Sequence, residues 1–190
     1  MIYLPKRAVF IHIPRTGGNS IKNAIASTCV GHGVPSLIST VPMFVREFER
    51  CQGHQTAAVL KGYIRDWNDI YRFAIHRPIK ERFVSMNNWV QRLKSNQHKI
   101  LEPIADEIKD FLEIEDHMKF FEDNWMEHTT QFFTQGHYGE DLGVEVYKFE
   151  DLPDRWDEIC DKCQIPRCEL PHLNKGASSS EITEKIKNSV

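Results

Sequence analysis

The first strongly patterned stretch of the chain joins an apolar run to an amphipathic segment through a turn that contains two glycines. The apolar run covers Ala8 to Ile13, and Ile21, Ala24 and Ile25 follow at the spacing of one helical face. This order predicts a strand, a loop and a helix. The preceding residues 1–7 are expected to lead straight into the strand.

A second stretch has the same organisation. A strand-like apolar run begins at Tyr71, Arg77 stands at the end of the strand, and Pro78 stands where the first turn of a helix tolerates a proline. From Pro78 to Lys94, apolar side chains recur every three or four residues, which predicts an amphipathic helix with one face in the core. Between the two stretches, residues 31–50 mix glycine, proline and serine and are expected to form a loop.

The rest of the pattern predicts further helices and one more strand. Helical spacing marks residues 103–121, 124–133 and 154–163, whereas residues 144–149 alternate as a strand should. Strands that alternate with helices predict the α/β class, in which helices flank a central parallel sheet through right-handed crossovers.

Length and composition are those of one ordinary globular domain. The 190 residues suffice for a core, so we expect a single domain over residues 1–190, with residues 176–190 as a polar C-terminal tail. The net charge of −3 gives no global attraction to nucleic acid or to an anionic membrane. No apolar stretch approaches the ~20 residues of a membrane helix and no signal-peptide pattern opens the chain, so a cytoplasmic protein is expected. No pattern indicates an oligomeric state.

The turn after the first strand gathers groups that bind anions. It consists of Pro14, Arg15, Thr16, Gly17, Gly18, Asn19 and Ser20. Its glycines let the backbone approach a ligand closely, its arginine adds a cation, and the first N–H groups of a helix have no partner within the helix. These features favour a phosphate or its sulfur analogue, although a tight turn without a ligand is the simpler alternative. The ATP-binding loop G-x-x-x-x-G-K-[ST] is absent.

The second strand carries a separate anion-binding signal. Arg77 stands at its end, and Ser85 follows about two helical turns later, where its hydroxyl would meet the same ligand if the helix runs past the site. In open α/β sheets, ligands bind outside the carboxyl ends of the strands. Two such ends with anion-binding groups therefore suggest one ligand that carries two anionic groups.

Together, these motifs resemble those of sulfotransferases that use 3′-phosphoadenosine 5′-phosphosulfate (PAPS). Residues 14–20 look like the 5′-phosphosulfate loop of this family, and Arg77-x7-Ser85 looks like its 3′-phosphate motif. Residues 53–57, which contain His54, resemble the His-x-x-Ala segment of carbohydrate and heparan-sulfate 2-O-sulfotransferases. Matches to later segments lie at Gln131, Tyr147–Leu152 and Leu170–Lys175.

The sequence departs from the family pattern at three positions. Arg15 stands where the family usually has lysine, Asn19 where it often has threonine, and His76 where asparagine is usual. Arginine keeps the positive charge but presents a planar fork of donors and cannot lose its proton. Stabilisation of the bridging oxygen survives this exchange in principle.

The resemblance implies a small sulfotransferase-like domain with a three-layer fold like that of P-loop NTPases. PAPS would be the donor, 3′-phosphoadenosine 5′-phosphate (PAP) the product, and a sugar or another hydroxyl-bearing molecule the acceptor. No metal is required, because fixed cations do its work. The implied roles are charge stabilisation by Arg15, proton abstraction by His54, binding of the 5′ phosphate by Thr16 and Ser20, binding of the 3′ phosphate by Arg77 and Ser85, and closure over the nucleotide by Asn174 and Lys175.

Structural roles remain possible alternatives for the two histidines, His12 before the loop and His54 after it. His54 is equally compatible with a surface or capping residue, although a pKa near ~6.5 suits a general base at neutral pH. His12, inside the first strand, is a competing base, and we favour a structural role for it.

Three other functions stay open. A P-loop phosphotransferase would share the fold, but its Gly-Lys-Ser/Thr loop and aspartate magnesium ligands are not found. A non-catalytic module that binds PAPS or a partner would keep Arg77 and Ser85 without the chemistry. A zinc-stabilised interaction domain rests on Cys160, Cys163, Cys168 and His172 alone.

Overall fold

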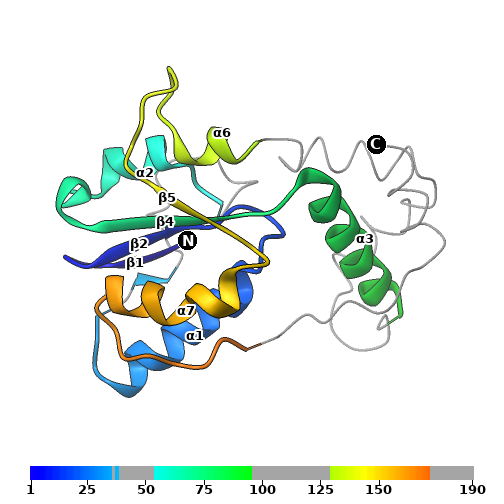
Figure 1. Ribbon diagram of the computed structural model, residues 1–190, viewed down its shortest axis with the longest axis horizontal. Helices are drawn as coiled ribbons and strands as arrows, with labels where there is room; N and C mark the ends of the chain where they lie inside the picture. The colour runs from blue at the N-terminus through cyan, green and yellow to red at the C-terminus, as the bar shows by residue number, and fades with distance from the viewer. Residues whose placement is uncertain (36, 39–53, 96–128, 172–190) are drawn as a thin grey trace. The chain divides into compact units, whose positions relative to one another are not determined.

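The computed structural model describes residues 1–35, 37–38, 54–95 and 129–171 (Figure 1). The predicted helix over residues 103–121 lies outside these ranges, as do Asn174 and Lys175, which are expected to close over the nucleotide. The chain divides into two compact units, one made of Met1–Arg77 and His128–Asn174, the other of Pro78–Glu127 and Lys175–Val190. Whether they form the single domain expected from the sequence stays a prediction.

A five-stranded sheet in the order β3-β1-β2-β4-β5 is the frame of the first unit. Its strands are β1 (Ile2–Leu4), β2 (Ala8–Ile11), β3 (Leu37–Ile38), β4 (Tyr71–His76) and β5 (Glu145–Lys148). The strands β2, β4 and β5 run parallel, whereas β1 is antiparallel to both of its neighbours. The α/β class is therefore confirmed, but the sheet is mixed rather than purely parallel.

The antiparallel edge arises where the sequence predicted only a lead-in. Leu4 ends β1, and a tight turn returns the chain into β2, with Lys6 at φ 61 and the Arg7 N–H donating to the Leu4 carbonyl at 3.0 Å. The strand β3 likewise falls in the segment expected to be a loop. Both predictions missed strands of two or three residues, which are too short to show a period.

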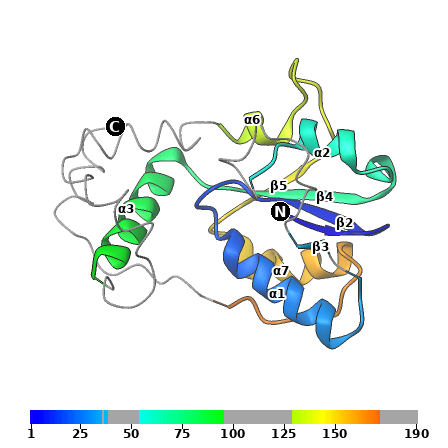
Figure 2. The same cartoon turned by 180° about the vertical axis from the view of Figure 1, so that it is seen from behind.

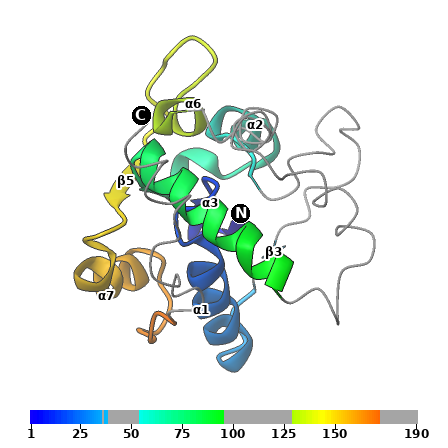
Figure 3. The ribbon, with the colours of Figure 1, turned by 90° about the vertical axis from the view of Figure 1, so that its right-hand side faces the viewer.

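Helices cover both faces of the sheet (Figures 1 and 3). On one face lie α1 (Gly18–Gly31) and α7 (Leu152–Lys162), as the view from behind also shows (Figure 2). On the other face, α2 (Ala57–Tyr63) packs against α6 (Thr130–Thr134). A 3-10 helix, η2 (Trp67–Asp69), precedes β4. The mixed sheet thus carries helices on both sides.

The main core lies between the sheet and the pair α1 and α7. All four residues of β2 are buried, as expected for a strand that is covered on both faces. Large apolar side chains of this core include Phe10, Phe73, Ile21, Ile25, Trp156 and Ile159.

The helices predicted by periodicity are confirmed where the structure describes them. The predicted helix from Pro78 to Lys94 is α3 (Ile79–Ser95), which belongs to the second unit. The predicted helix over residues 154–163 is α7, and the last part of 124–133 is α6. Within the part of the chain that the structure describes, no helix combines the length and the apolar character needed to cross a membrane.

Candidate anion-binding site

The glycine-containing loop joins β2 to α1, as the sequence predicted. Gly17 is the N-cap of α1 at φ 80 and offers no side-chain cap, and the N–H groups of Ser20 and Ile21 already donate to its carbonyl at 3.0 and 3.3 Å. The first turn of this 14-residue helix contains no acidic residue. The helix therefore begins with the N–H groups of Gly18 and Asn19. No carboxylate in that first turn offsets the positive end of the helix dipole.

Both glycines are required by aromatic neighbours as well as by the turn. A Cβ on Gly18 would lie 1.9 Å from the ring of His12, and a Cβ on Gly17 would lie 2.8 Å from the ring of Phe149. The two rings come from the ends of different strands, and both pack directly against the backbone at the start of α1. From the sequence, we attributed these glycines to the close approach of a ligand, and we did not predict that two aromatic rings pack against them.

Thr16 and Pro14 anchor the loop rather than project from it. Both are buried, and the Thr16 hydroxyl donates to the Ile13 carbonyl at 2.9 Å. That bond commits the hydroxyl hydrogen, so a contact from Thr16 to a 5′ phosphate would run through its backbone N–H. Arg15 adopts a left-handed conformation at φ 63 and is half-buried.

The end of β4 lies beside this loop. The two strands are paired in parallel with Ile11 opposite Ala74, so their carboxyl ends share one edge of the sheet. The Arg77 Nη1 group donates to the Arg15 carbonyl at 3.4 Å, and the Arg77 guanidinium lies 4.5 Å from the centroid of the Phe149 ring. The structure therefore brings together Arg77 and the loop, which the sequence assigned to one ligand.

His54 also lies at this edge, next to His12. The His54 Nδ1 atom is 2.8 Å from the His12 carbonyl oxygen, and the two rings are 4.3 Å apart. Because a carbonyl only accepts hydrogen bonds, His54 Nδ1 must carry a hydrogen, and in the neutral ring the lone pair then resides on Nε2. A half-buried imidazole held in this tautomer has the form that a general base needs.

His12 itself is buried and uncharged at neutral pH. Only 6% of the residue is exposed, and its Nδ1 atom has no hydrogen-bond partner among the described residues. Burial lowers the pKa of His12 well below its usual range, and His54, the amino group of Met1, Lys22 and Arg15 lower it further. The charged groups named here are all basic, so they favour a positive potential around the ring.

For three predicted residues, a place in this site stays a prediction. Ser85 lies on α3 in the second unit, and Asn174 and Lys175 fall outside the described residues. Their predicted contacts with the nucleotide stay predictions. Conversely, Phe149 lies in the matched segment Tyr147–Leu152 but was given no role at the site, although its place directly after the third parallel strand was a signal that could have indicated one.

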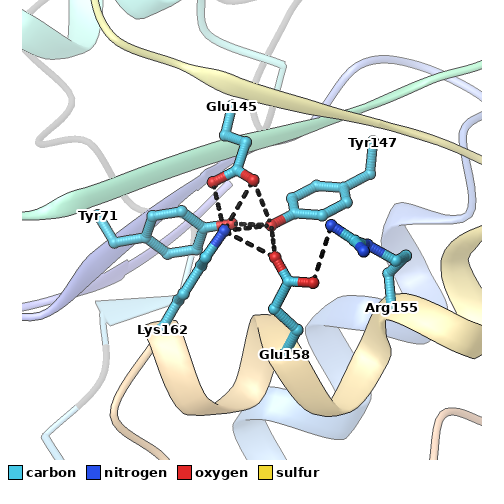
Figure 4. Close-up of polar contacts among 6 residues, drawn as sticks. All are labelled: Tyr71, Glu145, Tyr147, Arg155, Glu158 and Lys162. Carbon is cyan, nitrogen blue, oxygen red and sulfur yellow. Dashed lines mark hydrogen bonds and ion pairs between the residues drawn. The ribbon is translucent and has the colours of Figure 1, made fainter.

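A second polar cluster lies on the α7 side, where side chains from the sheet meet that helix (Figure 4). Its members are Tyr71, Glu145, Tyr147, Arg155, Glu158 and Lys162. The Lys162 ammonium contacts Glu145 and Glu158 at 2.7 Å each, and the Tyr71 and Tyr147 hydroxyls are 2.8 Å apart. The carboxylates, the ammonium and the hydroxyls of this cluster pair with one another through ion pairs and hydrogen bonds. The cluster therefore suits a structural role, in which it links the sheet to α7.

The cysteines that suggested a zinc site lie at α7 and after it. The Cys160 and Cys168 sulfur atoms are 4.0 Å apart, and burial raises the pKa of the Cys160 thiol to about 12. Cys163 is a buried free thiol, and His172 lies outside the described residues. In the ranges that the structure describes, no three His, Cys, Asp or Glu side chains are grouped so as to hold a metal ion.

The chain matches no family model, no curated protein and no solved structure. The functional argument therefore rests on the motifs of the chain and on the geometry at the carboxyl ends of its strands.

Proposed function

We propose that this protein is a sulfotransferase that transfers the sulfuryl group of PAPS to a hydroxyl of a carbohydrate acceptor. The observation that carries the proposal is the meeting of the loop 14–20, Arg77 and His54 at one sheet edge. A P-loop-like three-layer fold is part of the proposal, because an uncapped helix N-terminus after a buried strand is the place where such folds bind phosphate.

The residues present suit an anionic nucleotide. The start of α1 contributes backbone N–H groups, Arg15 and Arg77 contribute guanidinium groups, and the basic surroundings of His12 add to the positive potential. Guanidinium groups bind phosphate through paired N–H donors. Arg15 and the helix start would hold the 5′ phosphosulfate, and Arg77 would hold the 3′ phosphate.

The chemistry divides between two groups of the chain. PAPS supplies an activated sulfuryl group when it is bound. Arg15 and the N–H groups of the loop stabilise the charge that grows on the departing phosphate oxygen, an effect that reaches about 3–4 kcal/mol per well-placed donor in other enzymes. His54 Nε2 accepts the proton of the acceptor hydroxyl as its oxygen bonds to sulfur, and the resulting imidazolium keeps its Nδ1–H on the His12 carbonyl.

Nucleotide-dependent thermal stability tests the donor site. PAP, ADP and ATP are compared at equal concentration, and PAP at a hundred times its dissociation constant should add about 2.7 kcal/mol to the free energy of unfolding. Selective stabilisation by PAP supports the sulfotransferase. Stronger stabilisation by ATP would replace it with a phosphotransferase, and no response to any of the three would contradict a nucleotide site.

A further inference from the structure

Phe149 connects the two anion-binding motifs through its ring. It directly follows β5, and its backbone N–H donates to the His76 carbonyl at 2.9 Å, which fixes it beside the end of β4. A Cβ on Gly17 would lie 2.8 Å from its Cε2 atom, so the ring touches the start of α1. The Arg77 guanidinium lies 4.5 Å from the ring centroid.

We propose that Phe149 is a positioning residue that holds Arg77 ready for the second phosphate of the nucleotide. It thereby sets the preference for a 3′,5′-bisphosphate over a 5′-monophosphate. This inference rests on the proposed function, because it concerns the same nucleotide site.

The physical reason is the freedom of an arginine side chain. A guanidinium on a long flexible stem loses rotamer entropy whenever it is ordered by a ligand. The cation–π contact with the Phe149 ring, together with the bond from Nη1 to the Arg15 carbonyl at 3.4 Å, orders Arg77 before any ligand arrives. Pre-ordering removes that cost from the binding step.

The geometry of the contact suits this role. The central carbon of the Arg77 guanidinium lies over the Phe149 ring, 4.5 Å from its centroid, while the N–H donors of an arginine extend outward in the guanidinium plane and bind phosphate there. The same ring also contacts Gly17, so one rigid group sets the separation between the helix start and Arg77. A side chain of equal bulk without an aromatic face would fill the space but would not hold the cation.

Calorimetric titration with PAP and with 5′-AMP tests the inference, since these nucleotides differ only in the 3′ phosphate. The preference of the unchanged protein for PAP over 5′-AMP is measured first. Phe149→Leu should then weaken PAP binding about tenfold and leave the binding of 5′-AMP unchanged, while Phe149→Tyr, which keeps the ring, should retain the preference.

A double-mutant cycle with Arg77 separates positioning from general damage. In an Arg77→Ala background, Phe149→Leu should change the affinity for PAP less than twofold, because no cation remains to be held. If Phe149→Leu keeps the full preference, or weakens PAP and 5′-AMP equally, the inference is overturned and the proposed function stands. If the unchanged protein does not prefer PAP, the proposed function is overturned and the inference with it.

Discussion

The cluster around Lys162 and the site around His12 lie on the same sheet, but their charged groups are arranged in opposite ways. In the cluster around Lys162, the ammonium contacts Glu145, Glu158 and the Tyr147 hydroxyl at 2.7, 2.7 and 3.1 Å. Glu145 and Glu158 accordingly have lowered pKa values, with desolvation of Glu145 working in the opposite direction. Opposite charges meet there, and they tie β5 to α7.

The site at the carboxyl ends of β2 and β4 collects like charges instead. Arg15 and Gly17 adopt left-handed conformations, and burial, His54, the Met1 amino group, Lys22 and Arg15 lower the pKa of the His12 ring. Such an arrangement costs stability, and proteins tolerate this cost chiefly where a ligand or a reaction makes use of it. The contrast indicates that the first cluster holds the fold together, and it supports our proposal that the second site binds an anion.

The largest expected effect is on catalysis at the carboxyl ends. His54→Ala should reduce the release of PAP from PAPS, measured with a mixture of carbohydrate acceptors, by about 10²–10⁴-fold, because the general base is lost. The affinity for PAP should not change. His32→Ala, which alters an exposed histidine at the C-cap of α1, is the matched control and should behave as the unchanged protein. Undiminished turnover in His54→Ala would remove His54 as the base.

The next effect concerns the pH dependence of stability. The pKa of His12 is depressed in the folded state, so below its unfolded value near 6.5 the unfolded chain binds a proton that the native protein does not. The free energy of unfolding should therefore fall by up to about 1.4 kcal/mol per pH unit as the pH decreases through this range. His12→Gln should reduce that slope in urea titrations between pH 7 and pH 5, and the remaining slope belongs to groups such as the Met1 amino group, whose pKa burial lowers to about 5. A slope as steep as that of the unchanged protein would contradict a neutral buried His12.

A loss of similar size is expected from crowding the helix start. Gly18→Ala places a methyl group where the His12 ring lies, 1.9 Å away, and should lower stability by about 1–3 kcal/mol. Gly31→Ala at the end of the same helix meets no atom within 4 Å and serves as the control. Equal melting temperatures for the two variants would show that the His12 ring does not occupy this place.

The smallest effect belongs to the cluster around Lys162. Glu145→Gln should lower stability by less than about 1 kcal/mol at neutral pH, because the ion pair is well exposed to solvent and screened. The pKa of Glu145 is lowered in the fold, so this contribution is complete above its unfolded value near 4.5 and is lost as the pH falls through the folded value. PAP affinity should be unchanged. A loss of PAP binding would contradict the separation of the two regions.

Much of this fold followed from periodicity. The strands β2, β4 and β5 and the helices α1, α3 and α7 each contain enough residues for an apolar period to be visible. The hairpin between β1 and β2 could not be predicted in this way, because a strand of three residues and a turn through the left-handed Lys6 show no periodicity.

The candidate site was predictable in part for a different reason. The loop 14–20 and Arg77 stand at strand ends, and parallel pairing forces such ends together. The packing of His12 and Phe149 against Gly18 and Gly17 depends on which face of each strand end turns inward, and contacts between distant segments decide that.

A titration of the ¹⁵N-labelled protein with PAP, followed by amide NMR, tests the contrast most directly. The account predicts that the amide signals of residues 16–19 shift most, since their N–H groups would face the phosphate, while those of residues 145–147 do not move. Shifts centred on residues 145–147, or no shifts at either place, would contradict an anion site at the start of α1.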